Sequence, residues 1–555
     1  MKASSEESQE ASAAAGSWPT KRISGSGAAW KSLWVEVPDK HGLPAAWCYS
    51  DRMGYSPGET VKLYISSTVP KLDIVVKKDG FTPRTLTTWN DVSVDFQEVP
   101  AQPYMNGCGW QETITLELPQ DVAAGAYIVE MRDSKQNGNQ PALGHHIFFV
   151  RSNRGKTDKT VLLVASTCTW AAYNDWGGAS HYIGLHKDFP DGFSPILSSQ
   201  RPWARGQVWL PADAPRNVPK TRPRLPEQPY WGSKEWAFAN GYARYYASAG
   251  WATYERPFVI WAEQAGYDVH VIAQEDLELN PEAIAQYSCL VFVGHCEYWS
   301  APMRHTVEAF VERGGRVARF AGNFFWQIRL REGGSGQICY KSQARDYDPI
   351  RHENPKLMTS LWEDPMVGYP GAETFGVNGA RGIYAATFGI AQRSSRGFNV
   401  FRHKHWSLDA TGLGYADTFG DEASIFAYEV DGLDYTFVDG LPVPTGKDGA
   451  PAGLEIVAMN WASNSEYGLP EHSFHHERGD SEARFIASIL EVTPSPTAEA
   501  TEKYSRGSGM MVSFKRGIGE IFCAATCEWV RGLIEKDFYT DRITRNVLDR
   551  FVLRD

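Results

Sequence analysis

The sequence lacks any apolar run of the roughly 18 residues that a membrane-spanning helix needs, so no membrane partner is expected. It also lacks a basic excess: 55 Lys and Arg stand against 66 Asp and Glu, for a net charge of −11. Nucleic-acid binding requires a basic face, so a nucleic-acid partner is not expected either. The first residues are acidic and polar where a signal peptide would be apolar, and we expect a disordered tail over residues 1–29.

Common cofactor motifs are missing as well. There is no P-loop, no G-x-G-x-x-G after a first strand and no HExxH, so neither nucleotide cofactors nor a standard zinc site are expected. The 8 Cys are scattered; Cys523 and Cys527 lie close together, but their CxxxC spacing has no second half. Cysteines without a disulfide framework are typical of a reducing cytosol, which predicts a cytoplasmic protein whose thiols are mostly small buried hydrophobes.

Aromatic residues are abundant, at 13% of the 555 residues with 20 Trp. Such side chains fill large cores or line apolar pockets. With 42% hydrophobic and 22% charged residues, the composition is that of a globular enzyme, and the length allows several domains.

Residues 30–152 read as an all-β unit. Short, alternating segments rich in β-branched and aromatic residues are separated by turn signals, as in a β-sandwich of immunoglobulin or fibronectin type. The segments that we expect to be strands are 31–38, 60–68, 71–78, 112–119, 126–132 and 145–151.

The pattern changes after a polar linker, and residues 158–555 read as an α/β domain. Apolar strands alternate with helices, which predicts a parallel sheet with crossover connections. The expected strands are 160–166, 267–273, 288–294 and 316–322, with later ones at 453–460, 507–516 and 519–526. The alternation resembles the class I glutamine amidotransferase fold. Asn323 stands where that fold carries its nucleophilic cysteine, so nucleophilic catalysis of that kind is not expected.

Ligands of an open parallel sheet bind beyond the carboxyl ends of its strands. His295 and Glu297 follow one such strand, two positions apart, and suit either acid–base chemistry, metal binding or a hydrogen-bonded turn. Cys296 between them is not expected to be a nucleophile. Asn323 follows the next strand and can stabilise an oxyanion or occupy a turn at positive φ.

Two further residues are candidates. Tyr173 lies one turn past the first parallel strand, where its phenol is either an anionic oxygen ligand or a core aromatic with a satisfied hydroxyl. Glu429 in AYEVDG is either a second carboxylate of the site or an ordinary charge at the edge of a strand.

Long, ordered motifs carry a resemblance to a known family. They are TCTWAAYNDWGG, GHCEYWS, AGNFFWQ, HWSLDATGL and DEASIFAYEVDG. Over about residues 158–555 the chain resembles the C-terminal catalytic region of the N,N-dimethylformamidase large (beta) subunit family. The resemblance implies hydrolysis of a small N-substituted amide, such as a formamide, and either a small partner subunit or a homo-oligomer.

The resemblance also implies a mononuclear iron site (Fe³⁺) held by two tyrosines and one glutamate. By motif position, Tyr173 corresponds to one tyrosine and Glu297 to the glutamate, while His295, Asn323 and Glu429 correspond to residues of substrate binding and catalysis.

The second tyrosine position of the family aligns with Trp203, and an indole N–H cannot ligate iron. Tyr182 or Tyr230 could take its place. If neither does, a catalytically silent protein that binds a carbohydrate or an amide-like ligand becomes the alternative function.

Overall fold

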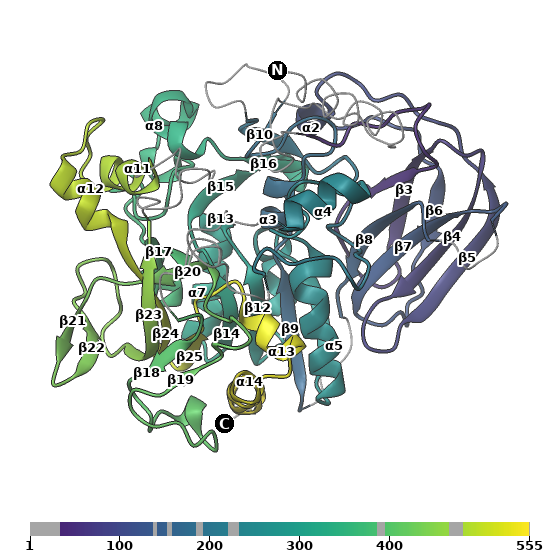
Figure 1. Ribbon diagram of the computed structural model, residues 1–555. Helices are drawn as coiled ribbons and strands as arrows, with labels where there is room; N and C mark the ends of the chain where they lie inside the picture. Colours follow the sequence, from purple (N-terminus) through teal and green to yellow (C-terminus); the bar gives the residue numbers. More distant parts are fainter. Residues whose placement is uncertain are drawn as a thin grey trace, which may run out of the picture.

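The computed structural model describes residues 34–136, 141–152, 158–184, 193–219, 232–385, 395–464 and 481–553. The predicted tail at 1–29 lies outside these ranges. A β-sandwich lies beside a larger α/β part that contains the central sheet (Figure 1). Among the described helices, none is both long and apolar enough to cross a membrane.

The β-sandwich consists of two sheets, with the strand orders β1-β3-β6 and β2-β8-β7-β4-β5. Buried side chains alternate with more exposed ones along β4 and β6, whereas β1, β7 and β8 are buried over most of their length. An apolar core fills the space between the two sheets. The strands are β1 Ala46–Ser50, β2 Gly54–Tyr55, β3 Thr60–Ser67, β4 Lys71–Lys78, β5 Arg84–Ser93, β6 Ile114–Glu117, β7 Gly125–Asp133 and β8 Gly144–Val150. Five of the predicted segments are therefore strands, whereas β1, β2 and β5 were not predicted.

The sixth predicted segment, residues 31–38, is not a strand over its described part. Trp34 is buried there and donates its indole N–H to the carbonyl of Tyr242 at 3.2 Å. The ring packs with Phe238 and Tyr246, which precede the predicted strand at 267–273. The alternation of apolar residues therefore reflects packing against the α/β part rather than pairing in the sandwich.

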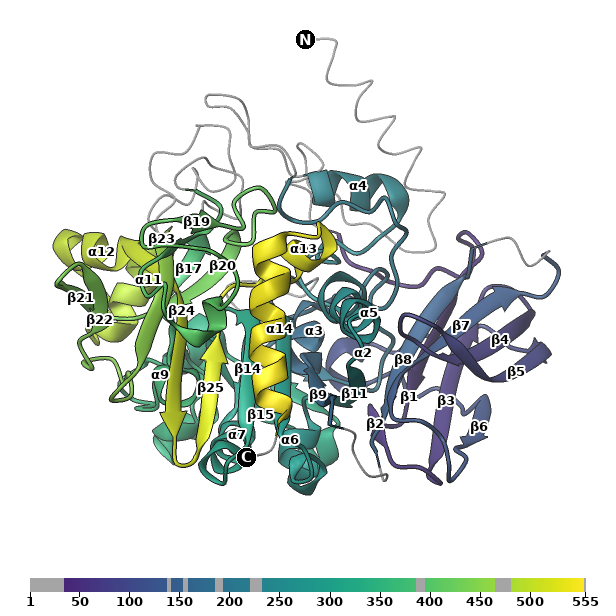
Figure 2. The same ribbon diagram turned by 90° about the horizontal axis from the view of Figure 1, so that it is seen from below.

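The first half of the central sheet is parallel, in the order β11-β9-β12-β14-β25 (Figure 2). Its strands are β9 Thr160–Ala165, β11 Asp268–Ala273, β12 Cys289–His295, β14 Arg316–Gly322 and β25 Gly519–Cys523. Almost every residue of β9, β12 and β14 is buried, as the continuous apolar runs predict for strands covered on both faces.

The second half of the sheet is antiparallel and was not predicted to be so. It continues β25-β24-β23-β17-β20, with β18 and β19 beside β23. A short turn joins β24 to β25, and a connection without a crossover helix permits only antiparallel pairing. These strands are β17 Asn378–Ala385, β18 Phe398–Val400, β19 Thr418–Phe419, β20 Tyr428–Gly432, β23 Glu455–Ser463 and β24 Arg506–Arg516. A separate hairpin pairs β21 Tyr435–Val438 with β22 Leu441–Pro444.

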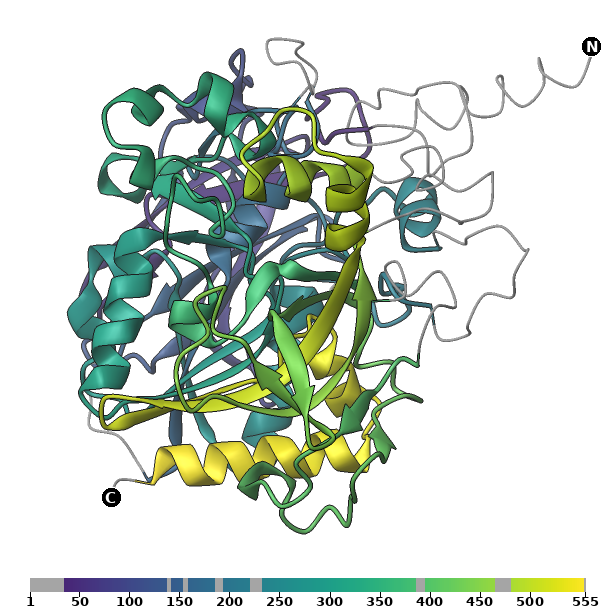
Figure 3. The same cartoon turned by 90° about the vertical axis from the view of Figure 1, so that its left-hand side faces the viewer.

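Helices cover both faces of the sheet. On one face lie α5 Arg256–Gln264, α13 Trp529–Ile534 and α14 Phe538–Val552, and α14 runs the length of the sheet (Figures 2 and 3). On the other face lie α6 Asp276–Leu279, α7 Ala301–Glu312 and α9 Ala372–Phe375. The other α-helices of the described ranges are α2 Pro103–Asn106, α3 Thr167–Tyr173, α4 Gly232–Asn240, α8 Ala344–Tyr347, α11 Ser481–Leu490 and α12 Ala498–Ser505.

A small second sheet stands at the carboxyl edge of the parallel strands. It has the order β10-β16-β15-β13, with β10 Ile196–Ser198, β13 Tyr298–Ser300, β15 Trp326–Leu330 and β16 Gly336–Ile338. The chain passes from β12 into β13 and from β14 into β15, so the segments between them are bends that link two sheets. The first bend carries Glu297, directly after His295 at the end of β12, and the second carries Asn323.

Candidate active site

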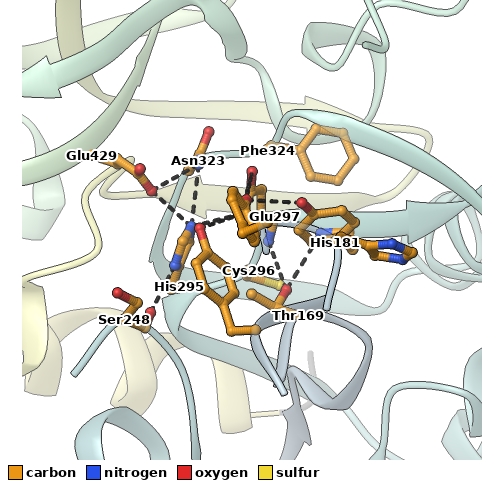
Figure 4. Close-up of polar contacts among 12 residues, drawn as sticks. Thr169, His181, Ser248, His295, Cys296, Glu297, Asn323, Phe324 and Glu429 are labelled. Carbon is orange, nitrogen blue, oxygen red and sulfur yellow. Dashed lines mark hydrogen bonds and ion pairs between the residues drawn. The ribbon is translucent and has the colours of Figure 1, made fainter. Parts of the chain in front are cut away.

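Three segments that follow parallel strands converge at this edge, as predicted. They are the helix after β9, the bend after β12 and the bend after β14. Tyr173 Oη lies 3.0 Å from Glu297 Oε2, and Asn323 Nδ2 lies 3.1 Å from His295 Nε2. Figure 4 shows His295 between Glu429 and Glu297, with Asn323 beside Glu429.

Two phenols meet the carboxylate of Glu297. Tyr173 donates to Oε2 at 3.0 Å, and Tyr182 lies 2.9 Å from both Oε1 and Oε2. The two rings stack with centroids 4.2 Å apart. Burial is the main cause that raises the pKa of both phenols well above the ordinary value, and the neighbouring Glu297 carboxylate raises it further. Each phenol therefore keeps its proton unless a cation approaches its oxygen.

The groups around this oxygen cluster hold it in place. Thr169 Oγ1 accepts from the backbone N–H of Glu297 at 2.9 Å, which ties the bend after β12 to α3. Tyr298 donates its hydroxyl to the oxygen of Tyr182 at 2.8 Å. The Lys341 ammonium lies 3.4 Å from the centroid of the Tyr182 ring, at the distance of a cation–π contact.

His295 forms the second half of the site. Its Nδ1 lies 2.8 Å from the carbonyl of Ser248, and its Nε2 lies 2.7 Å from Glu429 Oε2 and 3.2 Å from Glu297 Oε2. Burial disfavours its charge, but the carboxylates of Glu429 and Glu297 outweigh burial and raise its pKa to about 10. The imidazole therefore holds a proton at neutral pH. Burial also raises the pKa of Glu429, although His295 opposes this shift.

Asn323 occupies a left-handed backbone conformation, with φ of 59°. Asparagine tolerates this region better than most residues because of its short polar side chain. Its amide nitrogen donates to Glu429 Oε2 at 2.8 Å, while its Oδ1 is buried without a hydrogen-bond partner among the described residues. The interpretation of Asn323 as a turn residue at positive φ is therefore confirmed, and its side chain also contacts the candidate acid–base pair.

Two cysteines border the site. Burial raises the pKa of the Cys296 thiol to about 11, and its Sγ lies 3.3 Å from the indole nitrogen of Trp299, which does not favour a nucleophilic role. Cys527 follows β25, and its Sγ, His295 and a Glu429 carboxylate oxygen all lie within 4.8 Å of one another. Among the described residues, these side chains form a possible metal-binding triad.

A buried ion pair joins β14, which precedes the bend that carries Asn323, to β20, which carries Glu429. Arg319 Nη1 lies 2.8 Å from Asp431 Oδ2, and neither side chain is exposed. Asp431 Oδ1 also accepts from the backbone N–H of Phe324 at 2.8 Å. The pair therefore sets the position of the bend after β14 relative to β20.

Arg319→Met is expected to destabilise the fold by about 3–5 kcal/mol, because it leaves the Asp431 carboxylate buried without its cation. The double variant Arg319→Met with Asp431→Asn is expected to recover part of that loss, because it removes the stranded charge. Urea unfolding followed by circular dichroism measures both. A loss below about 1 kcal/mol, typical of an exposed ion pair, would contradict the role assigned to this pair.

The structure thus brings together Tyr173, His295, Glu297, Asn323 and Glu429, which sequence patterns predicted. Trp203 packs edge to face on Trp170 with ring centroids 5.8 Å apart, and Tyr182 rather than Trp203 contacts Glu297. Tyr230 lies outside the described residues.

Sequence reasoning missed Tyr298 and Cys527. Tyr298 belongs to the same GHCEYWS motif as Glu297, so its place beside the site residues was a usable signal. Cys527 carried no such signal, because a single cysteine after a late strand is usually a buried apolar residue.

Comparison with known proteins identifies one family. The family model described as N,N-dimethylformamidase beta subunit-like, C-terminal, matches residues 75–541. None of the curated proteins matches the chain. Among solved structures, the sporulation control protein Spo0M from Bacillus subtilis matches with 14% identity and a TM-score of 0.14. That match covers 20% of this chain and 51% of Spo0M, about half of its length.

Proposed function

Because the chain belongs to the N,N-dimethylformamidase beta subunit-like family, we propose that it hydrolyses the C–N bond of a small amide, such as a formamide, at the site around Glu297 and His295. The observation that carries this proposal is the convergence of two phenols on one carboxylate beside a protonated imidazole.

The residues fit the ferric ion that the family resemblance implies. Tyr173, Tyr182 and Glu297 offer three hard oxygen donors, which Fe³⁺ prefers. Two buried carboxylates, Glu297 and Glu429, surround a single imidazolium, so a bound cation would balance the remaining negative charge. When bound, the ion would supply a Lewis acid that polarises the amide carbonyl.

The proposed roles of the other residues follow from their contacts. Asn323 has two amide N–H bonds, so it can hold Glu429 with one and the carbonyl oxygen of the substrate with the other. Glu429 accepts a proton from the attacking water, and His295 delivers a proton to the departing amine. Water adds to the carbonyl carbon and the C–N bond breaks, which yields a carboxylic acid and an amine.

The alternative function, a catalytically silent binding protein, was expected to apply if a second phenol was missing beside Glu297. Tyr182 supplies that phenol, and its presence supports amide hydrolysis over the binding-only function. We propose that the substrate is a linear amide. We also propose that the chain acts either with a small partner subunit or as a homo-oligomer. The family description as beta subunit-like supports the former, and we propose a cytoplasmic location.

We further propose that residues 30–152 and 158–555 are separate domains and that the second is related to class I glutamine amidotransferases. The five neighbouring parallel strands and the left-handed turn at Asn323, where those enzymes carry their nucleophile, support this relation. Here the bend leads into β15 rather than into a helix, which fits the absence of a nucleophile at this position.

A phenolate bound to ferric iron absorbs visible light, so the purified protein is expected to be coloured. Tyr173→Phe and Tyr182→Phe are each expected to weaken or shift the absorption band, because each removes one phenolate oxygen. Absorption spectra and iron content of the purified variants measure this effect, and release of amine from formamides measures activity.

Tyr245→Phe is the matched control, because its ring packs against both Tyr173 and Tyr182 and its substitution removes only a hydroxyl. It is expected to keep the band. A band that is unchanged by Tyr182→Phe would exclude Tyr182 as the second phenolate. Iron-free, colourless protein with full amidase activity would overturn the iron site itself.

A further inference from the structure

A second set of donor atoms combines His295 and Glu429 with a buried thiol. It consists of a ring nitrogen of His295, a Glu429 carboxylate oxygen and Cys527 Sγ, which all lie within 4.8 Å of one another. We call it the thiol triad. All its side chains are buried, and its donors are nitrogen, oxygen and sulfur rather than oxygen alone. Such a set suits a borderline or soft divalent cation better than Fe³⁺.

The backbone holds the triad together. The Cys527 N–H donates to the Glu429 carbonyl at 3.1 Å, and the Asp431 N–H donates to the Ala525 carbonyl at 3.1 Å. Gly322, at the end of β14, permits this approach, since a Cβ there would lie 2.6 Å from the Cys527 nitrogen and 2.7 Å from the Glu429 carbonyl oxygen. The start of β20 and the segment after β25 are therefore locked to each other beside His295.

The imidazole is oriented as in many zinc sites. His295 Nδ1 faces the Ser248 carbonyl at 2.8 Å, which leaves Nε2 to face the triad. A backbone acceptor on one ring nitrogen commonly orients the other nitrogen toward a metal. Tetrahedral zinc bonds of 2.0–2.3 Å place donors roughly 3.5 Å apart, so side-chain movements of about 1 Å would close the triad around an ion.

We propose that the thiol triad binds a divalent cation such as Zn²⁺ or Cd²⁺ and that this binding inhibits the enzyme. The ion displaces the proton shared by His295 and Glu429 as well as the proton of the Cys527 thiol, and both protons pass to solvent. The two residues assigned to proton transfer then become ligands. The inhibition rests on the proposed amide hydrolysis, whereas the binding does not.

The test titrates the purified full-length protein with Cd²⁺ alone and follows the ultraviolet absorption of a thiolate–cadmium bond. One equivalent is expected to bind with this absorption. Cys527→Ser is expected to remove the absorption and to weaken binding by more than the roughly 10–100-fold that loss of an outer hydrogen-bond partner costs. Cys289→Ser is the matched control, because this buried thiol lies at the opposite end of β12 from His295.

Absence of the thiolate absorption in the parent protein, or its persistence in Cys527→Ser, would overturn the site. Loss of the visible phenolate band in proportion to the Cd²⁺ added would show that Cd²⁺ displaces iron. That result would overturn the proposal that the thiol triad is a site separate from the iron site. If Cys527→Ser does not fold, crystals of the parent protein soaked in Zn²⁺ decide: an anomalous peak at the thiol triad supports the site, and a peak elsewhere refutes it.

The inhibitory role has its own readout. Zn²⁺ is expected to inhibit amine release by the parent and by Cys289→Ser, but not by Cys527→Ser, each relative to its own zinc-free rate. Equal inhibition of all three would overturn the role. If the protein hydrolyses no amide, the proposed function fails, and the cadmium titration still decides whether the site exists.

Discussion

Glu297→Ala is expected to yield protein without iron and to lower amide hydrolysis by at least about 10³-fold. Glu297 is the carboxylate that both phenols contact, so its removal leaves Tyr173 and Tyr182 without the group that gathers their oxygens. Loss of a Lewis acid removes several kcal/mol of transition-state stabilisation, which corresponds to a rate change of that size. Iron analysis, the visible spectrum and kcat/KM for a formamide measure the effect.

Glu275→Gln is the control for this variant. Glu275 is a carboxyl that follows β11 at the same edge of the sheet, and burial raises its pKa to about 7, but it contacts Thr167 rather than the oxygen cluster. It is expected to keep iron and activity. Full iron content in Glu297→Ala would show that the metal is bound elsewhere, and full activity without iron would show that hydrolysis does not depend on it.

His295→Gln is expected to keep the iron and its colour but to lower kcat by about 10²–10⁴-fold, the usual contribution of acid–base catalysis. Glutamine can form hydrogen bonds but cannot deliver a proton at neutral pH. Glu429→Gln is expected to have a similar effect, because Glu429 Oε2 and His295 Nε2 lie 2.7 Å apart and share one proton.

The double variant separates a coupled pair from two independent groups. If His295 and Glu429 act as a unit, the double variant loses about as much activity as either single variant, because each substitution alone already disables the pair. Multiplicative losses in kcat would contradict the coupling. Loss of iron from His295→Gln would instead assign His295 a role in holding the metal.

Local sequence patterns predicted the parallel strands β9, β11, β12, β14 and β25 of the central sheet. Strands β9, β12 and β14 appear as apolar runs because both of their faces are buried. Helix α7 begins after Ser300, whose hydroxyl accepts from the N–H of Met303 at 3.3 Å, and it ends before Gly314 and Gly315. The rule that ligands bind at the carboxyl edge of parallel strands then placed Tyr173, Glu297 and Asn323 together.

The same patterns failed where a residue's partner is distant in the chain. Alternation at 31–38 predicted a strand, yet Trp34 packs against residues more than 200 positions away. Strands β23 and β24 were predicted but their antiparallel pairing was not, because a buried strand has the same apolar pattern whether its neighbour runs parallel or antiparallel. Strands β17, β18, β19 and β20 of the same half were not among the predicted strands.

By itself, the sequence determined the alternation of buried strands and helices, the family, and five of the residues that meet at the site, because each of these depends on local periodicity or on a contiguous motif. Only the tertiary structure decided that Tyr182 is the phenol that reaches Glu297, 115 positions away, and that Cys527 lies beside His295 and Glu429. Both outcomes depend on how the sheet brings distant segments to one edge, and the spacing of residues along the chain does not encode that approach.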